Sequence, residues 1–215
     1  MTGKRGAVDV ETPVTIALPK GRLLSTLLDY LSSRGFALDF EERKLVARDP
    51  GGVFNAFLVK NNDLPTYVSH GIAGLGICGT DVIYESGHRF FTLLTFPFGR
   101  TTMCLAGKRD ETGSPDRRRM SVATKFTRFT QDYFHTRGIP VQIIKLEGSV
   151  ELAPVLGLAP YIVDLVETGN TLKANNLAVI EKLKEIEVQL IANPSYYKLH
   201  YKRIDWIAER LGAKA

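Results

Sequence analysis

The chain has 215 residues, of which 44% are hydrophobic and 24% charged, and its formal net charge at pH 7 is +5. This length and composition are typical of a globular protein with one large domain or two small ones. No stretch approaches the roughly 18 apolar residues that a membrane-spanning helix needs, and the N-terminal segment MTGKRGAVDVETP lacks the apolar region of a secretory signal.

Cysteine usage and charge distribution narrow the class further. Cys78 and Cys104 each lie inside an apolar run, which is typical of reduced core thiols in a cytoplasmic protein, and no metal-ligand spacing is present. The basic clusters Lys108–Arg109 and Arg117–Arg119 flank a stretch with Gly, Ser and Pro, so we expect a solvated loop there. A nucleic-acid site would need a longer basic stripe with exposed aromatics, whereas a small polyanionic ligand suits the mild positive excess.

Short apolar runs alternate with amphipathic segments, which is the pattern of an α/β protein with largely parallel strands. In the first half the sequence predicts, in chain order, a strand at 14–18, a helix at 23–35, a strand at 53–59, a helix at 65–71 capped by Asp63, a strand at 74–79, a short helix at 81–87, and two strands within 90–107. In the second half it predicts a strand at 120–124, a helix at 126–138, a strand at 141–146, a short helix at 149–157, a strand at 161–166, a long helix at 171–187, a strand at 189–193 and a helix at 194–212.

Two consecutive α/β groups joined near residues 99–107 predict two lobes. Lobe I would contain residues 1–100 and 190–215, and lobe II residues 101–189. Ligands in such architectures bind outside the carboxyl ends of strands, often between lobes. We therefore expect the active site in the cleft between the two lobes.

The segment ALPKGRLL at 17–24 is the first of three strand-to-loop transitions with polar residues. Gly21 permits close backbone approach, and Lys20 and Arg22 can bring positive charge to a phosphate at a helix N-terminus. A turn with two solvated cations is the simpler interpretation of this segment alone.

The segment KLEGSVELAP at 145–154 is the second transition. Gly148 and Ser149 open a predicted helix whose third position is Glu151. The pattern fits a helix with an acidic first turn, and it also fits a second loop that faces an anion.

The segment YIVDLVETGNTLKANN at 161–176 is the third transition. Asp164 lies inside an apolar strand, where an unpaired carboxylate is costly. Thr168, Gly169 and Thr171 offer hydroxyl and backbone N–H groups to a phosphate, and the carboxylates of Asp164 and Glu167 can accept hydrogen bonds from vicinal hydroxyls. A phosphorylated sugar presents both features, whereas a capped helix with a solvent-facing Glu167 is the alternative.

The four histidines are scattered, with no Ser–His–Asp arrangement and no His-x-x-x-His. The sequence therefore indicates a chemistry without a protein nucleophile or a transition metal, based on positioning and charge stabilisation.

Taken together, these segments resemble the ATP phosphoribosyltransferase family, the first enzyme of histidine biosynthesis. The matching segments occur in the family's order and cover most of the chain: ALPKGRL (17–23), RKL (43–45), DLPTYVSHGIAGLGICGTDV (63–82), VATKF (122–126), IIKLEGSVELAPVLGLA (143–159) and VDLVETGNTLKANNL (163–177). The resemblance implies an α/β fold with two lobes, similar to type II periplasmic binding proteins, each lobe a mainly parallel sheet flanked by helices. It also implies transfer of the 5-phosphoribosyl group from 5-phosphoribosyl 1-pyrophosphate to N1 of ATP, with Mg²⁺ held mainly by the substrate phosphates.

The resemblance assigns the site residues as follows. Arg22 and Arg43 would be catalytic cations. The donor would be bound by Asp164, Val166, Glu167, Thr168, Gly169, Asn170 and Thr171, with Gly148, Ser149 and Glu151. ATP and pyrophosphate would be bound by Lys20, Gly21, Arg22, Lys60 and Leu75.

The sequence departs from the family pattern at Lys60, where many members carry arginine, and at Gly74, where an acid is usual. Because lysine cannot replace a bidentate arginine contact, the nucleotide contacts at these two positions are open. The chain stops after the last predicted helix, so we expect the short, catalytic-only form, which pairs with a regulatory subunit similar to a histidyl-tRNA synthetase in a hetero-octamer. The alternative hypothesis is a non-catalytic module of the same architecture that captures a small anion.

Overall fold

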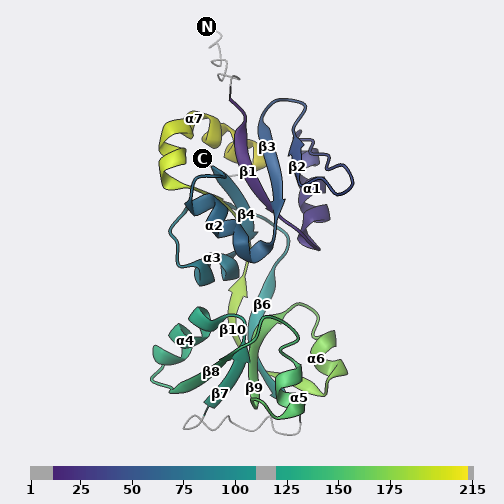
Figure 1. Ribbon diagram of the computed structural model, residues 1–215, viewed down its shortest axis with the longest axis vertical. Coiled ribbons are helices and arrows are strands. Elements are labelled where there is room, and N and C mark those ends of the chain that lie inside the picture. The colour runs from purple at the N-terminus through teal and green to yellow at the C-terminus, as the bar shows by residue number, and fades with distance from the viewer. Residues whose placement is uncertain (1–11, 110–119, 213–215) are drawn as a thin grey trace. The chain divides into compact units, whose positions relative to one another are not determined.

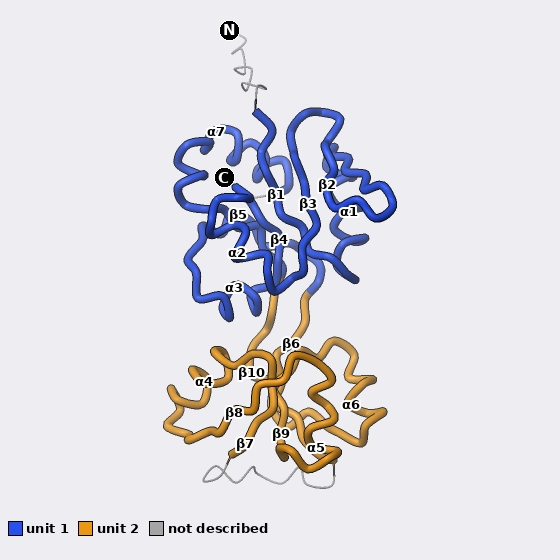
Figure 2. The backbone as a smooth tube through the Cα atoms, in the orientation of Figure 1, with its two compact units in different colours: residues 1–99, 188–215 blue, residues 100–187 orange. Residues whose placement is uncertain are grey.

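The computed structural model describes residues 12–109 and 120–212 (Figure 1). The chain forms two compact units (Figure 2), unit 1 with Met1–Gly99 and Val188–Ala215, and unit 2 with Arg100–Glu187. No helix in these described ranges is long and apolar enough to cross a membrane. The basic cluster Arg117–Arg119 and most of the N-terminal segment considered above lie outside the described residues.

Unit 1 is a mixed sheet of six strands in the order β2-β3-β1-β4-β11-β5, flanked by helices (Figure 1). Its strands are β1 (Val14–Pro19), β2 (Val46–Arg48), β3 (Phe54–Val59), β4 (Leu75–Gly79), β5 (Phe91–Thr95) and β11 (Val188–Ala192). Its helices are α1 (Leu23–Ser33), the 3₁₀ turn η1 (Asn61–Asp63), α2 (Leu64–Ser69), α3 (Thr80–Ser86) and α7 (Pro194–Leu211).

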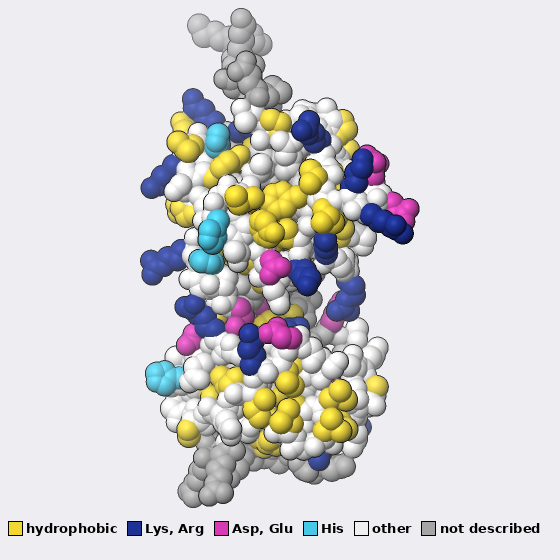
Figure 3. Space-filling model, in the orientation of Figure 1, with side chains coloured by type: hydrophobic (Ala, Val, Ile, Leu, Met, Phe, Trp, Pro, Cys, Tyr) yellow, Lys and Arg dark blue, Asp and Glu magenta, His cyan; other side chains and the backbone are white. Residues whose placement is uncertain are grey.

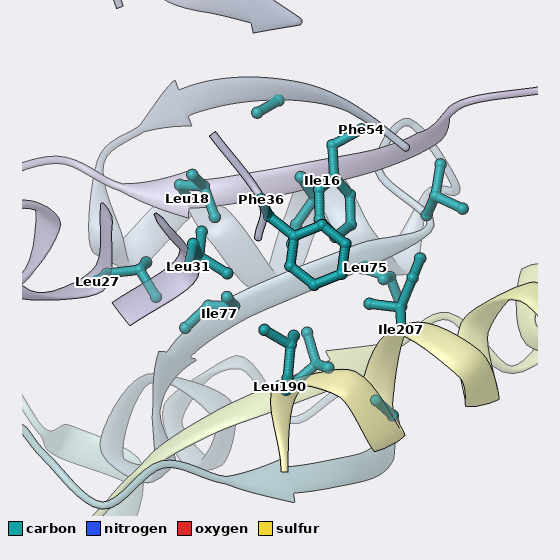
Figure 4. Packing of buried hydrophobic residues seen from close by; sticks show 14 of the residues in the cluster. Ile16, Leu18, Leu27, Leu31, Phe36, Phe54, Leu75, Ile77, Leu190 and Ile207 are labelled. Atoms are coloured by element: carbon teal, nitrogen blue, oxygen red, sulfur yellow. The ribbon is translucent and has the colours of Figure 1, made fainter. Parts of the chain in front are cut away.

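The core of unit 1 forms where α1 and α7 pack on the sheet. Strand β1 is buried along nearly its whole length. Helices cover both faces of the sheet, so the side chains on both faces of this strand are shielded from solvent. Figure 4 shows Leu27 and Leu31 of α1 and Ile207 of α7 directed at the apolar side chains of the strands. Asn193 is the N-cap of helix α7, and its side chain accepts hydrogen bonds from two backbone N–H groups. Gly212, with φ of 104°, is the C-cap.

Unit 2 is a mixed sheet of five strands in the order β10-β6-β9-β7-β8. Its strands are β6 (Thr101–Lys108), β7 (Met120–Thr124), β8 (Val141–Lys145), β9 (Tyr161–Val166) and β10 (Leu177–Ile186). Its helices are α4 (Thr127–His135), α5 (Leu152–Leu156) and α6 (Asn170–Ala174). One hydrophobic cluster includes Phe129 and Phe134 of α4 with Val163 of β9, and a second includes Ala153 of α5 and Leu172 of α6 with Ile162 of β9. Val163 and Ile162 contact different clusters because successive side chains of a strand point to opposite faces of the sheet.

The predicted long helix at 171–187 is wrong. Only Asn170–Ala174 is helical, and Leu177–Ile186 is strand β10. The helix ends at Ala174, with Asn175 as its C-cap. Asn176 follows with φ of 55°, in the left-handed region that asparagine tolerates better than most residues. The strand then pairs antiparallel with β6, and this pairing outweighs the helix-forming Leu, Glu and Lys residues of the segment.

The expected parallel character of the sheets is also corrected, because both are mixed. In unit 1, β1 pairs parallel with β3 and β4, but β11 pairs antiparallel with β4 and β5. The reversal follows from the chain path, since the chain leaves unit 1 after β5 and returns at β11. In unit 2, β7 pairs parallel with β8 and β9, whereas β6 pairs antiparallel with β9 and β10. Asp63 does not cap α2 with its side chain, because the turn Asn61–Asp63 already leads into the helix.

Candidate active site

The carboxyl ends of β7, β8 and β9 lie at one edge of the sheet of unit 2, because these three strands run parallel. The segments that follow them are therefore neighbours: Lys125 after β7, residues 146–151 after β8, and residues 167–171 after β9. Thr102 near the start of β6 pairs with Val166 at the end of β9, so β6 begins at this same edge. Figure 3 shows acidic and basic side chains of unit 2 gathered at the end where β6 begins, and hydrophobic ones over other parts of this face.

The loop after β9 is exposed and has a tight turn at its centre. Glu167, Thr168, Asn170 and Thr171 are exposed to solvent. Gly169 has φ of 73° and ψ of 7° and immediately precedes α6, a left-handed conformation that favours glycine. The hydroxyl Oγ1 of Thr168 accepts from the backbone N–H of Asn170 at 3.5 Å. The loop thus carries exposed hydroxyl groups at the start of a helix.

The end of β9 is fixed from the neighbouring strand. Oγ1 of Thr101 donates a hydrogen bond to the carbonyl oxygen of Val166 at 3.1 Å. The last residue of the strand is therefore tied to β6 by its carbonyl group, and the exposed loop begins from a fixed position.

Asp164 lies two residues before the end of β9, and its side chain is 21% exposed. Its Oδ1 atom is buried and has no hydrogen-bond partner among the described residues. The same atom lies 3.4 Å from Nζ of Lys125, within ion-pair distance. A buried carboxylate oxygen that has a counter-charge but no donated hydrogen bond is an unsatisfied acceptor.

The loop after β8 brings Gly148, Ser149 and Glu151 to this edge. Gly148 and Ser149 are exposed, and Glu151 is partly buried just before α5. Ser149 has φ of 46°, a strained conformation for a residue with a side chain. Its carbonyl oxygen accepts from the backbone N–H of Leu152 at 3.1 Å, which closes the turn into α5.

A pocket of about 350 Å³ lies beside the loop after β9. Its lining includes Glu167, Thr168 and Gly169 of the loop, with Thr102, Cys104, Arg109, Lys173 and Lys182. Burial raises the pKa of the Cys104 thiol above its ordinary value, and the nearby Lys182 lowers it in part. This thiol is therefore largely protonated near neutral pH and is no candidate nucleophile.

In unit 1, four cationic residues from three segments of the sequence lie toward one edge of the sheet. Strands β1 and β3 are parallel with Pro19 opposite Val59, so Lys20 and Lys60 follow adjacent strand ends. The backbone N–H of Lys20 donates to the carbonyl oxygen of Val59 at 2.9 Å. Strand β2 runs antiparallel to β3, so Arg43, which precedes β2, lies toward this same end. Arg22 follows Lys20 and precedes α1.

The backbone at two of these positions has positive φ. Gly21 has φ of 106°, and a Cβ atom there would meet nothing within 4 Å, so its conformation and not a lack of space favours glycine. Arg43 has φ of 64°, and its side chain is 92% exposed with Nε 3.8 Å from Oε1 of Glu42. An arginine held in a left-handed conformation at an exposed position is uncommon, and such strain is often found at functional sites.

The structure does not bring the side chain of Leu75 to this edge. Leu75 is 0% exposed and belongs to the hydrophobic core, where Figure 4 shows it among Phe36, Ile77 and Ile207. Its register partner is Ile16 in the middle of β1, away from Lys20. Only its backbone is left for a ligand contact.

No group of three or more His, Cys, Asp or Glu side chains that could hold a metal ion occurs in the described ranges. Mg²⁺ commonly takes one or two carboxylates and several substrate or water oxygens. Asp164 in β9 and Glu167 in the loop that follows it fit that minimal donor set.

Lys125 is the residue of this edge that sequence reasoning missed. It belongs to the VATKF segment, but nothing in its own sequence neighbourhood pairs it with Asp164. A signal was present in the position, since a cation two residues before a helix opposes the helix dipole, and a nearby negative charge offsets that cost.

Comparisons with known proteins show the family to which this chain belongs. The family model HisG, ATP phosphoribosyltransferase, matches residues 60–213. The ATP phosphoribosyltransferase of Sorangium cellulosum is 43% identical over 204 residues, which are 94% of this chain and 95% of that protein. The enzyme of the same name from Caldicellulosiruptor bescii is 43% identical over 206 residues, 92% of this chain and 97% of that protein.

Solved structures show the same likeness. The ATP phosphoribosyl transferase (HisG:HisZ) complex from Thermotoga maritima contains a chain that is 36% identical with a TM-score of 0.80, covering 92% of this chain and 96% of that one. The alkanesulfonate-binding protein SsuA from Xanthomonas axonopodis pv. citri, bound to MOPS, has a TM-score of 0.60 at 10% identity, covering 93% of this chain and 72% of that one. This second likeness concerns the fold alone, which is of the type II periplasmic-binding-protein kind.

The ordered motifs, the fold and these relatives lead to one conclusion. The chain belongs to the ATP phosphoribosyltransferase family, the enzymes that transfer the 5-phosphoribosyl group of 5-phosphoribosyl 1-pyrophosphate to N1 of ATP in the first step of histidine biosynthesis.

Proposed function

We propose that the edge of unit 2 around Asp164 and residues 167–171 binds the phosphoribosyl donor, and that the cations at the edge of unit 1 act on the phosphates of ATP and of the leaving pyrophosphate. The observation that carries this proposal is the buried Oδ1 of Asp164, which has no hydrogen-bond partner in the described part of the chain. Asp164 lies four residues before Thr168, where the exposed T-G-N-T turn begins. A sugar phosphate offers both hydroxyl donors and an anion.

The ribose hydroxyls would donate hydrogen bonds to the carboxylates of Asp164 and Glu167. An ionised carboxylate only accepts, so it matches hydroxyl donors and rejects phosphate oxygens. Hydrogen bonds to charged groups contribute about 1.5–3 kcal/mol each. These contacts would set the position of the anomeric carbon with respect to the incoming nucleotide.

The 5-phosphate would bind to the loop Glu167–Thr171. The hydroxyl groups of Thr168 and Thr171 and the backbone N–H groups that begin α6 are its donors, and Gly169 allows the backbone to approach closely. Val166 and Asn170 take part through their backbone. Gly148, Ser149 and Glu151 would line the neighbouring part of the same edge.

Lys20, Gly21, Arg22, Arg43 and Lys60 would bind the pyrophosphate and the phosphates of ATP. As the bond between the anomeric carbon and the pyrophosphate oxygen breaks, the ribose gains oxocarbenium character and the leaving group gains charge. Arg22 and Arg43 would stabilise that charge, and contacts of this kind contribute about 3 kcal/mol each in the transition state. N1 of ATP forms the new bond to the anomeric carbon from the opposite face.

Mg²⁺ is the proposed metal, and it would arrive bound mainly to the substrate phosphates. When bound, it supplies neutralisation of phosphate charge. The proposed tasks of this chain's own residues are to accept the ribose hydroxyls at Asp164 and Glu167 and to hold the phosphate groups at the two loops.

A regulatory partner similar to a histidyl-tRNA synthetase, in a hetero-octamer, is also part of the proposal. The support is the structure of the Thermotoga maritima HisG:HisZ complex, whose catalytic chain is 36% identical to this one. A cytoplasmic location is proposed as well, and the two free, buried cysteines, Cys78 and Cys104, are in keeping with it.

The test of the reaction is direct. Purified chain is incubated with ATP, Mg²⁺ and 5-phosphoribosyl 1-pyrophosphate, alone and with a HisZ-type partner, and N1-(5-phosphoribosyl)-ATP is followed by absorbance and mass spectrometry. We expect product that depends on all three reagents. Tight donor binding without product in both settings would instead support the non-catalytic anion-binding alternative.

A further inference from the structure

Lys125 is held in place by contacts with Asp164 and with the ring of Phe126. Its Nζ lies 3.4 Å from Oδ1 of Asp164, and the two side chains are 34% and 21% exposed. The same Nζ lies 4.8 Å from the centroid of the Phe126 ring, which is itself buried. An ammonium group over an aromatic face is attracted to it, so the lysine has a defined position without any ligand.

The backbone on either side of Lys125 is tied to β9 next to Asp164. Thr124 is 0% exposed, and its Oγ1 donates to the carbonyl oxygen of Val163 at 2.6 Å. Oγ1 of Thr124 also accepts a hydrogen bond from the backbone N–H of Phe126 at 2.9 Å. These two hydrogen bonds fix residues 124–126 against the strand position that precedes Asp164.

The charge of Lys125 is unfavourable unless it has a partner. It stands two residues before helix α4, whose first turn contains no acidic residue. The N-terminus of a helix carries partial positive charge and disfavours cations. The carboxylate of Asp164 supplies the compensating negative charge, and each residue thereby offsets the cost of placing the other in a partly buried position.

We propose that Lys125 is a positioning residue for the phosphoribosyl donor, acting through Asp164. It holds the carboxylate of Asp164 in the partly buried orientation in which the oxygens accept from the ribose hydroxyls. This inference rests on the proposed role of Asp164 as a ribose ligand.

The number of acceptor sites agrees with that role. An ionised carboxylate has about four lone-pair sites, and no described residue donates a hydrogen bond to Oδ1. Lys125 neutralises the charge without using up the acceptor capacity that vicinal hydroxyls need. Without the lysine, the carboxylate would be more stable turned toward water and away from the ribose position.

The test is a double-mutant cycle of Lys125→Met and Asp164→Asn, read as the donor Kd by calorimetry and as kcat and KM for the donor and for ATP. Lys125→Met should weaken donor binding about tenfold, as expected for loss of one charge-assisted contact. The KM for ATP and the kcat at saturating donor should change less than threefold. Lys125→Arg, which keeps the charge, should stay within about threefold of the wild-type donor Kd.

Two controls separate positioning from a fold defect. Lys202→Met removes a lysine on α7 whose Nζ lies 6.0 Å from the Tyr201 ring and should leave the donor Kd unchanged. The melting temperature of every variant is measured, and if Lys125→Met does not fold, Lys125→Gln takes its place in the cycle.

The double-mutant cycle distinguishes an effect of Lys125 through Asp164 from a direct contact of Lys125 with the donor. In the Asp164→Asn background, Lys125→Met should cause no further loss of donor affinity, because its partner is already gone. A second tenfold loss there would show direct contact with the donor and would overturn the inference. An unchanged Kd in Lys125→Met, with a weakened Kd in Asp164→Asn, would overturn the inference alone. An unchanged Kd in Asp164→Asn would overturn the donor site itself.

Discussion

The ring of Tyr196 fills the space beside Gly74 that a side chain at that position would occupy. A Cβ atom built on Gly74 would overlap the Tyr196 ring. The backbone of Gly74 cannot move away easily, because its N–H group donates to the carbonyl oxygen and the hydroxyl of Thr15 at 3.0 and 2.9 Å. The family resemblance places an acidic residue at position 74. In this chain the ring of Tyr196 on α7 occupies the space that such a side chain would need.

Gly74→Ala should lower the free energy of unfolding by about 1–3 kcal/mol, the usual cost of overpacking a filled site. Urea denaturation measures it. Gly148→Ala is the matched control, since a Cβ atom there meets nothing within 4 Å. In the double variant Gly74→Ala with Tyr196→Ala the two losses should be less than additive. Strict additivity would contradict the steric account.

Arg43→Ala should lower kcat more than it weakens donor binding, since the guanidinium is proposed to act on the leaving pyrophosphate. The expected loss in kcat is about a hundredfold or more. Steady-state kinetics with Arg43→Ala, Arg43→Lys and Arg43→Gly measures it, and Arg43→Lys should recover only part. Because Arg43 has φ of 64°, Arg43→Gly should unfold at no lower urea concentration than the wild type. An unchanged kcat in Arg43→Ala would remove this residue from the site.

Thr171→Ala should weaken donor binding about tenfold through loss of a hydrogen bond to a charged phosphate. The backbone should stay in place, because the Thr171 carbonyl oxygen still accepts from Nδ2 of Asn175 at 2.9 Å. The donor Kd is measured by calorimetry. Thr136→Ala, at an exposed threonine that bonds only within its own helix end, is the control, and an equal effect in both variants would contradict the assignment.

Because of the buried thiol of Cys78, the free energy of unfolding should fall at alkaline pH. Burial raises the pKa of this thiol above its ordinary value of 9.0, and Asp81 adds to the rise. The unfolded chain therefore loses the proton above pH 9 while the folded protein keeps it, so the contribution is complete below pH 9 and falls above it by about 1.4 kcal/mol per pH unit. The difference in unfolding free energy between wild type and Cys78→Ala, measured from pH 8 to 10.5, should shrink accordingly. A constant difference would contradict this linkage.

Elements with a continuous apolar run and clear boundaries could be predicted from the sequence. Strands β7 and β9 are of this kind, and Gly169 at its turn followed from the T-G-N-T pattern. Strand β10 could not be predicted, because its register shifts at Val179/Glu181 and Lys182/Lys184 interrupt the alternation that marks a strand. Its helix-forming residues then imitate a helix, and only the pairing with β6 decides otherwise.

The candidate site was predictable to a similar degree. Local pattern identified Asp164 and the loop that follows it, since a carboxylate at a strand end before a glycine turn is visible in one segment. The pairing of Asp164 with Lys125 depends on the register of β7 and β9, and the position of Arg43 toward the same end of the sheet as Lys60 depends on the antiparallel pairing of β2 with β3. Such contacts join residues far apart in the chain, and no local pattern encodes them.

A crystal structure of the protein with 5-phosphoribosyl 1-pyrophosphate and Mg²⁺ would locate the donor directly. We expect the 5-phosphate on the backbone and hydroxyl groups of Glu167–Thr171, and a ribose hydroxyl within hydrogen-bond distance of the Asp164 carboxylate. Donor density at another place, with Asp164 contacting only Lys125, would contradict this expectation.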